Sequence, residues 1–300
     1  MREIPAGYSR LENSARVPAA GARLVGPADP AETLSVTLRV RRRPDAPPLP
    51  GPEELAAPPP GQRRFLSRED FAARYGAAPA DLAAVADFAR GQGLTVIESN
   101  AARRSVIASG TVEQMSRAFA VDLGRYETPT HAYRGREGHL HLPANLSNVV
   151  EAVFGLDNRQ MARPLHARVS SPALGINPLT PPQVAKLYDF PSSQAATGQT
   201  IGLLEFGGGY RLSDIQKFFN GLGLKTPNLT AVGVDGATNA PGIDSDEDTE
   251  VALDIDVAGA VAPGANVTVY FAPWTEKGWV DAVTTAVHDA VNRPSVLSIS

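Results

Sequence analysis

Two acidic residues, Glu250 and Asp254, stand four positions apart within the segment that runs from Asp244 to Pro273. In a helix, residues four apart lie on one face with their Cβ atoms about 5–6 Å apart, so the two carboxyl groups would be held side by side. Carboxylates held so close repel each other and usually share a proton, which suits them to acid–base catalysis. The pair is therefore a candidate catalytic site.

The sequence around this pair also fits other structures. The apolar residues Leu253, Ile255 and Val257 alternate with the acidic residues Asp254 and Asp256, and this period of two would suit a half-exposed strand. Acids clustered as in a first helical turn, an Ala-rich interior and the Ala-Pro-Gly stop at 262–264 favour a helix instead. Even in a helix, the acids could form a solvated charged face, as charge runs usually do. The sequence alone leaves this choice open.

A calcium loop fits the same segment less well. Asp244, Asp246 and Asp248 alternate as they would in an EF-hand. Counted from Asp244, however, Thr249 stands where the glycine is required and Ile255 where the bidentate glutamate is required. We therefore expect no metal site within residues 1–300.

Other positions also have residue types capable of chemistry. Glu205 is near the end of the apolar segment TIGLLEF, where a carboxylate is hydrogen-bonded or functional unless the strand tip already lies in solvent. The glycines at 207–209 predict a tight turn into a helix, because neither a dinucleotide nor a P-loop pattern is complete there. His139 and His141 would share one side of a strand, but without a third ligand they favour a polar strand face over a metal site.

Composition limits the protein class. The chain has 300 residues, of which 43% are hydrophobic, enough for two domains with separate cores. It contains no cysteine, which excludes a disulfide framework and a thiolate zinc site. No run of about 18 apolar residues predicts a membrane span, and the first residues lack the apolar segment of a standard signal peptide.

Charge is divided unevenly between the two parts of the chain. Residues 1–170 carry 22 arginines and 18 acids, a net charge of +4, whereas residues 171–300 carry 6 basic and 14 acidic residues, a net charge of −8. The parts are therefore electrostatically complementary. Neither has a dense basic face interleaved with aromatic residues, so we expect no nucleic-acid partner.

The first part is predicted to be an α+β domain. Residues 1–33 are rich in Ala, Gly and Pro without periodicity and predict a flexible N-terminal arm. From residue 34 to 160, two β-α-β units with antiparallel neighbours predict a sandwich of the ferredoxin-like type. The Pro-rich stretch at 44–60 predicts a loop, Ser67 an N-cap, and residues 146–157 a last short helix.

The second part is predicted to be an α/β domain. Residues 161–179 show no sustained period and predict an exposed linker at a domain boundary, of the kind that proteases cut. In residues 180–300, apolar strands alternate with helices, which predicts a parallel sheet covered on both faces. Active sites in such sheets lie beyond the carboxyl ends of the strands.

Several motifs resemble one known family. The run TEVALDIDVAGAVAPGANVTVYFAP, with IGLLEFGGGY before it and AVTTAVHDAVNRPSVLSIS after it, resembles the sedolisin family of serine-carboxyl peptidases, and the kumamolisins within it. The segments FLSREDFAARYG, SVIASGTVEQMSRAFAV and LSNVVEAVFGLDNR resemble that family's propeptide. The likeness covers roughly residues 34–300. It implies an α+β prodomain followed by a subtilisin-like α/β domain.

The resemblance assigns roles to the acidic residues. In this family a glutamate replaces the subtilisin histidine, and the motif maps that general base onto Glu250 and its supporting aspartate onto Asp254. Glu205 matches a carboxylate that extends the hydrogen-bond chain from this pair. The implied reaction is acyl transfer at a peptide carbonyl, with an acidic optimum because the base is a carboxylate.

Other family features lie outside this stretch of sequence. The resemblance places the nucleophilic serine, the oxyanion aspartate and a calcium site beyond residue 300, so the 300 residues alone are expected to form an incomplete catalytic domain without peptidase activity. The family's export implies a secreted protein that acts on polypeptides, and we expect a monomer. A non-catalytic binding protein that keeps the fold is the alternative.

The uneven division of charge suggests a role for the prodomain. The basic prodomain is expected to bind the acidic catalytic part, to assist its folding and to block it until carboxylates are protonated. Processing is expected between residues 163 and 172. This tract contains Arg163, Arg168, Ser170 and Ser171.

Overall fold

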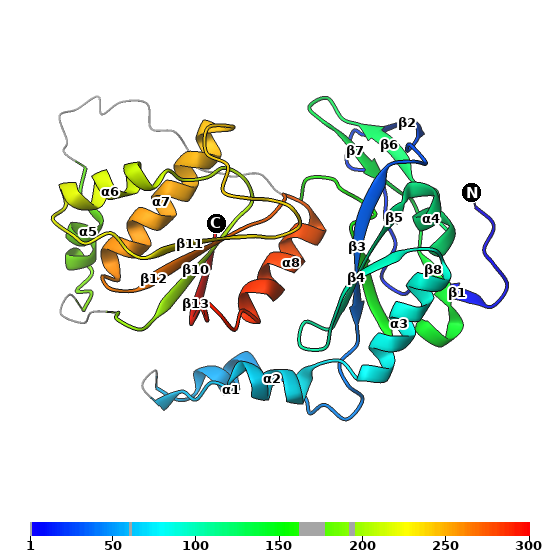
Figure 1. The fold of residues 1–300 in the computed structure, drawn as a ribbon, viewed down its shortest axis with the longest axis horizontal. Coiled ribbons are helices and arrows are strands. Elements are labelled where there is room, and N and C mark those ends of the chain that lie inside the picture. The colour runs from blue at the N-terminus through cyan, green and yellow to red at the C-terminus, as the bar shows by residue number, and fades with distance from the viewer. Residues whose placement is uncertain (1, 60–61, 162–177, 192–195) are drawn as a thin grey trace. The chain divides into compact units, whose positions relative to one another are not determined.

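The computed structural model describes residues 2–59, 62–161, 178–191 and 196–300. The chain divides into two compact units, Met1–Arg159 and Gln160–Ser300 (Figure 1). The expected processing residues Arg163, Arg168, Ser170 and Ser171 lie outside the described residues.

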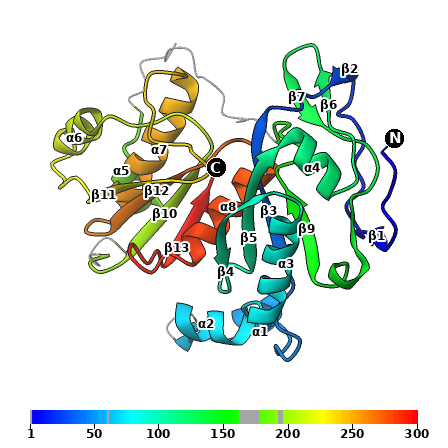
Figure 2. The same cartoon turned by 45° about the vertical axis from the view of Figure 1, so that its right-hand side comes forward.

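The first unit is built on a four-stranded antiparallel sheet in the order β4-β5-β3-β9. The strands are β3 (Thr33–Val40), β4 (Thr95–Asn100), β5 (Ser105–Thr111) and β9 (Val150–Phe154). Helices α3 (Pro79–Gly91) and α4 (Val112–Ala118) lie on one side of this sheet (Figure 1, Figure 2). Their side chains share one core with the sheet, as the fully buried Val36, Val85 and Met115 illustrate.

Short polar sequences start the helices of this unit. The Ser67 hydroxyl accepts a 2.9 Å hydrogen bond from the Asp70 N–H and caps α2 (Arg68–Tyr75) as predicted. Thr111 and Gln114 form a reciprocal capping box at the start of α4. Such caps satisfy backbone N–H groups that a helix leaves without partners.

The N-terminal residues differ from the flexible arm that we predicted for residues 1–33. They contain β1 (Tyr8–Arg10), which pairs with β8 (His141–Pro143), and β2 (Arg23–Pro27), which pairs with β6 (Gly124–Glu127). Leu11 is only 2% exposed and belongs to the core. Partners more than a hundred positions away stabilise these strands, so local composition gave no sign of them.

Two smaller predictions for this unit are also wrong. The Pro-rich stretch contains the short helix α1 (Pro52–Ala56), with proline in its first turn, where its missing N–H costs nothing. The expected helix at 146–157 is instead the 3₁₀ turn Ala144–Leu146 followed by the edge strand β9. A short apolar run fits either a strand or a buried helix, and here the pairing with β3 decides.

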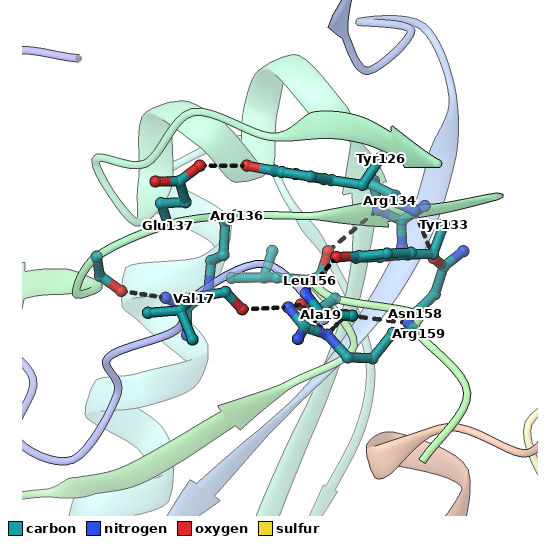
Figure 3. A network of polar contacts seen from close by, with 12 residues as sticks. Val17, Ala19, Tyr126, Tyr133, Arg134, Arg136, Glu137, Leu156, Asn158 and Arg159 are labelled. Carbon is teal, nitrogen blue, oxygen red and sulfur yellow. Dashed lines mark hydrogen bonds and ion pairs between the residues drawn. The ribbon is translucent and has the colours of Figure 1, made fainter. Parts of the chain in front are cut away.

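A polar network surrounds the last residues of the first unit (Figure 3). It centres on β7 (Ala132–Gly135), the partner of β6. The buried Arg134 side chain donates to the Leu156 and Gly155 carbonyls and to Glu32, while its backbone exchanges hydrogen bonds with Asn158. The Arg159 guanidinium lies 5.0 Å from the ring centroid of Tyr133. The network therefore fixes the last residues before the predicted linker.

The second unit is built on a four-stranded parallel sheet in the order β11-β12-β10-β13. The strands are β10 (Thr200–Glu205), β11 (Leu229–Gly233), β12 (Asn266–Phe271) and β13 (Val296–Ile299). The helices are α5 (Pro181–Leu187), α6 (Leu212–Gly221), α7 (Ser245–Val261) and α8 (Glu276–Val287).

Apolar side chains cover both faces of this sheet, as the sequence predicted. Leu203 belongs to a core shared with Phe219 of α6 and Ile255 of α7. The next residue of β10, Leu204, belongs to a separate core with Ala282 of α8. Successive side chains of a strand point to opposite faces, so α6 and α7 cover one face and α8 covers the other. Among the described helices, none is long and apolar enough to cross a membrane.

Candidate active site

Helix α7 holds the acidic pair. The Asp244 side chain caps the helix by accepting hydrogen bonds from the N–H groups of Asp246 (2.8 Å) and Glu247 (3.3 Å). The helix then continues to Val261, so the strand interpretation of this segment is wrong. The alternating aspartates form the cap and the first turn of this helix rather than a calcium loop. Acids suit this place, because negative side chains interact favourably with the positive end of the helix dipole.

The charges of both members of the pair act on Glu205. It is the last residue of β10 and only 3% of it is exposed, so the alternative of a solvated strand tip is wrong. Burial, and then the charges of Asp254 and Glu250, raise its pKa from an ordinary 4.5 to about 8. Both carboxylates must therefore lie on the side of α7 that faces Glu205. The three acids together form what we call the carboxylate cluster, Glu205, Glu250 and Asp254.

The cluster stands at the carboxyl ends of two neighbouring strands. Strand β13 pairs in parallel with β10, and Ser300 follows β13 directly. The Ser300 hydroxyl donates a 2.6 Å hydrogen bond to Asp254 Oδ2. Asp254 thus lies between the ends of both strands, at the edge of a parallel sheet where active sites are found.

The glycine turn after β10 brings α7 close to the sheet. Gly207 and Gly208 have φ values of +145° and +62°, which favour glycine. A Cβ atom on Gly208 would lie 2.6 Å from the carbonyl carbon of Glu247, and one on Gly207 would overlap the Glu247 carboxylate. The predicted tight turn is therefore confirmed, and its glycines are needed both for backbone conformation and for space.

A loop from 234 to 242 borders this turn. Asn239 accepts a 2.7 Å hydrogen bond from the Tyr210 N–H and donates one of 3.1 Å to the Tyr210 carbonyl. The Gly242 N–H donates a 2.6 Å bond to Asp248 in the first turn of α7. These bonds connect the loop to the glycine turn and to the helix, so the site is bordered by backbone that is held at several points.

The cluster can store and transfer protons. With its raised pKa, Glu205 is protonated at neutral pH, when an ordinary glutamate is ionised. Its Oε1 is buried and has no hydrogen-bond partner among the described residues. A protonated acid buried next to two further carboxyl groups is the arrangement expected for general acid–base work.

Sequence reasoning missed one buried charged group. The Lys277 ammonium donates to Asp235 and, over 2.8 Å, to Asp281. Lys277 and Asp281 are about 95% buried and stand one helical turn apart in α8. The i, i+4 spacing was visible in the sequence, but Asp235 follows β11 and reaches them only through the fold. The ion triad connects the 234–242 loop to α8.

The histidine pair lies in the first unit. The Nδ1 atoms of His139 and His141 are buried without a hydrogen-bond partner among the described residues. Burial, followed by the charges of His139 and Arg10, lowers the pKa of His141. The described residues contain no group of three or more His, Cys, Asp or Glu arranged to hold a metal ion.

The first unit matches a known family. The sequence model of the family described as "Pro-kumamolisin, activation domain" matches residues 20–159. This range ends at the last residue of the first structural unit.

Similar proteins extend the likeness to the second unit. The chain is 40% identical to kumamolisin of Bacillus sp. (strain MN-32) over 310 aligned positions, covering 100% of this chain and 55% of kumamolisin. It is 29% identical to tripeptidyl-peptidase sed5 of Aspergillus fumigatus, covering 97% of this chain and 55% of that protein. It is 25% identical to sedolisin of Pseudomonas sp. (strain 101), covering 79% of this chain and 42% of sedolisin. The chain thus spans about half the length of these relatives.

A solved structure of Pseudomonas sedolisin, a serine-carboxyl proteinase complexed with two molecules of pseudo-iodotyrostatin, also matches. The match has a TM-score of 0.33 and 23% identity, and covers 40% of this chain and 34% of that one. The family assignment rests on the sequence matches above. Together they support a proform of the sedolisin family, because residues 20–159 match the pro-kumamolisin activation domain and the whole chain is similar to kumamolisin.

Proposed function

We propose that the whole protein is a serine-type endopeptidase of the serine-carboxyl class, made as a proform and active in acid. The observation that carries the proposal is the carboxylate cluster, in which Glu250 and Asp254 act on the buried Glu205 at the carboxyl edge of a parallel sheet. The sequence similarity to kumamolisin over the whole chain supports the same conclusion.

In this proposal Glu250 is the general base. A serine supplied by the part of the family's catalytic domain beyond residue 300 attacks the peptide carbonyl, and its hydroxyl proton passes to Glu250. Glu250 then gives the proton to the leaving amine as the peptide C–N bond breaks, which leaves an acyl-enzyme that water hydrolyses by the reverse sequence. Asp254 supports Glu250 from one turn further along α7.

Glu205 extends the chain of carboxyl groups. When protonated it can donate a hydrogen bond, and a donor next to two carboxylates stabilises their negative charge. A carboxylate accepts a proton readily only where the pH is near its pKa, so the reaction is expected to be fastest in acid.

The activation domain is proposed to assist folding and to inhibit. The charge difference between residues 1–170 and 171–300 favours their association at neutral pH and weakens it when carboxylates are protonated. Processing is proposed between residues 163 and 172. Secretion, a monomeric state and a family calcium site beyond residue 300 belong to the same proposal.

The domain assignment is likewise proposed at its finer level. The antiparallel order β4-β5-β3-β9, with helices on one side, supports a ferredoxin-like activation domain in residues 34–160. The parallel sheet with helices on both faces supports a subtilisin-like catalytic domain that starts near residue 180.

The test is acid processing of the full-length protein. After transfer from pH 7 to pH 4, we expect mass spectrometry to find a cut between residues 163 and 172 and peptidase activity to rise. E250Q should remain unprocessed, whereas D214N, which changes an exposed acid in the first turn of α6, should be processed normally. Activity in E250Q equal to that of the parent would overturn the role of Glu250 as the base, whereas a full-length protein without activity at either pH would favour the non-catalytic binding protein.

A further inference from the structure

Glu247 contacts the turn that follows Glu205. It lies in the first turn of α7, three positions before Glu250 and therefore on the same side of the helix. Its carboxylate fills the space above Gly207, where any side chain would overlap it, and it accepts a hydrogen bond from the Gly208 N–H. The first turn of α7 is thus fixed against residues 207 and 208.

Glu247 also contacts the segment that follows β12. The same carboxylate accepts a hydrogen bond from the Trp274 side chain. The Trp274 ring packs on the buried Phe206 ring at 4.8 Å between centroids. Phe206 is the next residue after Glu205, so one carboxylate connects three segments: the helix of the acidic pair, the turn after β10 and the segment after β12.

We propose that Glu247 is a positioning residue that holds Glu205 in place against Glu250 and Asp254. Glu205 is attached to the sheet and the pair is attached to α7, so their separation depends on how the helix is fixed to the strand end. The Asp244 cap and the Gly242 bond to Asp248 join α7 only to its own N-terminal end and to the 234–242 loop. Glu247 joins it to the residues next to Glu205.

The surroundings of Glu247 fit this role. Burial and then the charge of Asp244 raise its pKa, while the hydrogen bonds from Gly208 and Trp274 lower it, and Asp248 adds to the repulsion. An ionised acid at this position therefore has a cost that the two hydrogen bonds offset only in part. A glutamine keeps one acceptor oxygen and the size of the side chain, whereas an alanine keeps neither.

The catalytic meaning of this inference rests on the proposed function, so the experiment has two separate readouts. The first uses the full-length protein with ¹³C-labelled glutamate and follows the pKa of Glu205 by NMR. In E247A we expect that pKa to fall from about 8 toward its ordinary value, because Glu205 moves away from the other two carboxylates. E247Q should lie between E247A and the parent, and D214N should match the parent.

The second readout is kcat and KM of the full-length enzyme. Displacing a catalytic group by about 1 Å can cost 10²-fold in rate, so E247A should lose roughly 10- to 100-fold in kcat with KM little changed. Denaturation by urea identifies any variant that fails to fold, and E247Q keeps the test informative in that case.

The outcomes separate the two proposals. An unchanged Glu205 pKa in folded E247Q and E247A would overturn the positioning role, whatever the activity. A lowered pKa with unchanged kcat would support the positioning role and contradict the catalytic use of Glu205. A lowered pKa together with a lowered kcat is the expected result.

Discussion

Asp254 accepts a 2.6 Å hydrogen bond from Ser300 and exerts the strongest charge effect on the pKa of Glu205. It thus joins α7 to the residue that follows β13 and acts by its charge on the last residue of β10. The effect of Glu250 on Glu205 is smaller. The two acids can therefore be ranked by how much each of them raises the pKa of Glu205.

Neutralising Asp254 should lower the pKa of Glu205 more than neutralising Glu250 does. Burial, and then repulsion by the two acids, raise this pKa from 4.5 to about 8. D254N and E250Q each remove part of the repulsion, to which Asp254 contributes the larger share. NMR titration of labelled glutamate measures both values, with D214N as the control. A larger decrease in E250Q than in D254N would contradict the arrangement described.

Replacing Glu205 should change how stability depends on pH. Its folded-state pKa is raised to about 8, so between about pH 4.5 and pH 8 the folded chain binds a proton that the unfolded chain lacks. Stability from this group is therefore full below pH 4.5 and falls as pH rises, by up to about 1.4 kcal/mol per pH unit. E205Q should lose that slope in urea denaturation at pH 5 to 8. If the slope is the same in E205Q and D214N, Glu205 is not the source.

Adding a methyl group at Gly208 should destabilise the second unit far more than at Gly236. Both glycines have positive φ, +62° and +83°, so alanine costs about 1–2 kcal/mol at either position. Gly236 has open space around the added atom, whereas at Gly208 that atom would lie 2.6 Å from the Glu247 backbone. Urea denaturation of G208A and G236A should therefore differ clearly. Equal losses of stability in G208A and G236A would show that the contact between α7 and the turn is loose.

Protonation of His141 should weaken the first unit in acid. Burial lowers the folded-state pKa of His141, so the neutral form is favoured by folding. Its contribution to stability is full above the unfolded pKa of about 6.5 and is lost as pH falls below that value. Thermal unfolding between pH 7 and pH 5 should show a smaller decrease in Tm for H141Q than for the parent. H131Q, at an exposed histidine, should behave as the parent does.

Removing Arg134 should release the end of the first unit. Its side chain is 8% exposed and bonds two carbonyls and Glu32, so R134A leaves buried polar groups without partners at a cost of about 3–5 kcal/mol. R125A removes an exposed pair with Glu127, worth about 1 kcal/mol or less. Limited proteolysis should cut R134A, but not R125A, before Arg159. Equal resistance would contradict the role given to the network.

Local sequence patterns were sufficient where the elements are long or capped. The alternating strands and helices of residues 180–300 and the cap at Ser67 appear as predicted. The helix that carries Glu250 was decided only by the structure, since its apolar positions suit two periods.

Long-range contacts explain what local patterns missed. The strands in residues 1–33 are stabilised by partners near residues 124–143, and β9 by its pairing with β3. The Lys277 triad needs Asp235, which adopts a left-handed conformation with φ of +53° after β11. Neither the backbone conformation of Asp235 nor the pairing of these strands can be predicted from the neighbouring residues alone.

The central position of β10 has a consequence for how the second unit folds. Its two neighbours, β12 and β13, come much later in the chain, and Ile201 pairs with both Val267 and Val296. Closing such long segments loses entropy before any contact is made, so sheets of this kind form slowly and expose their edges meanwhile. We therefore expect the carboxylate cluster to form late in folding.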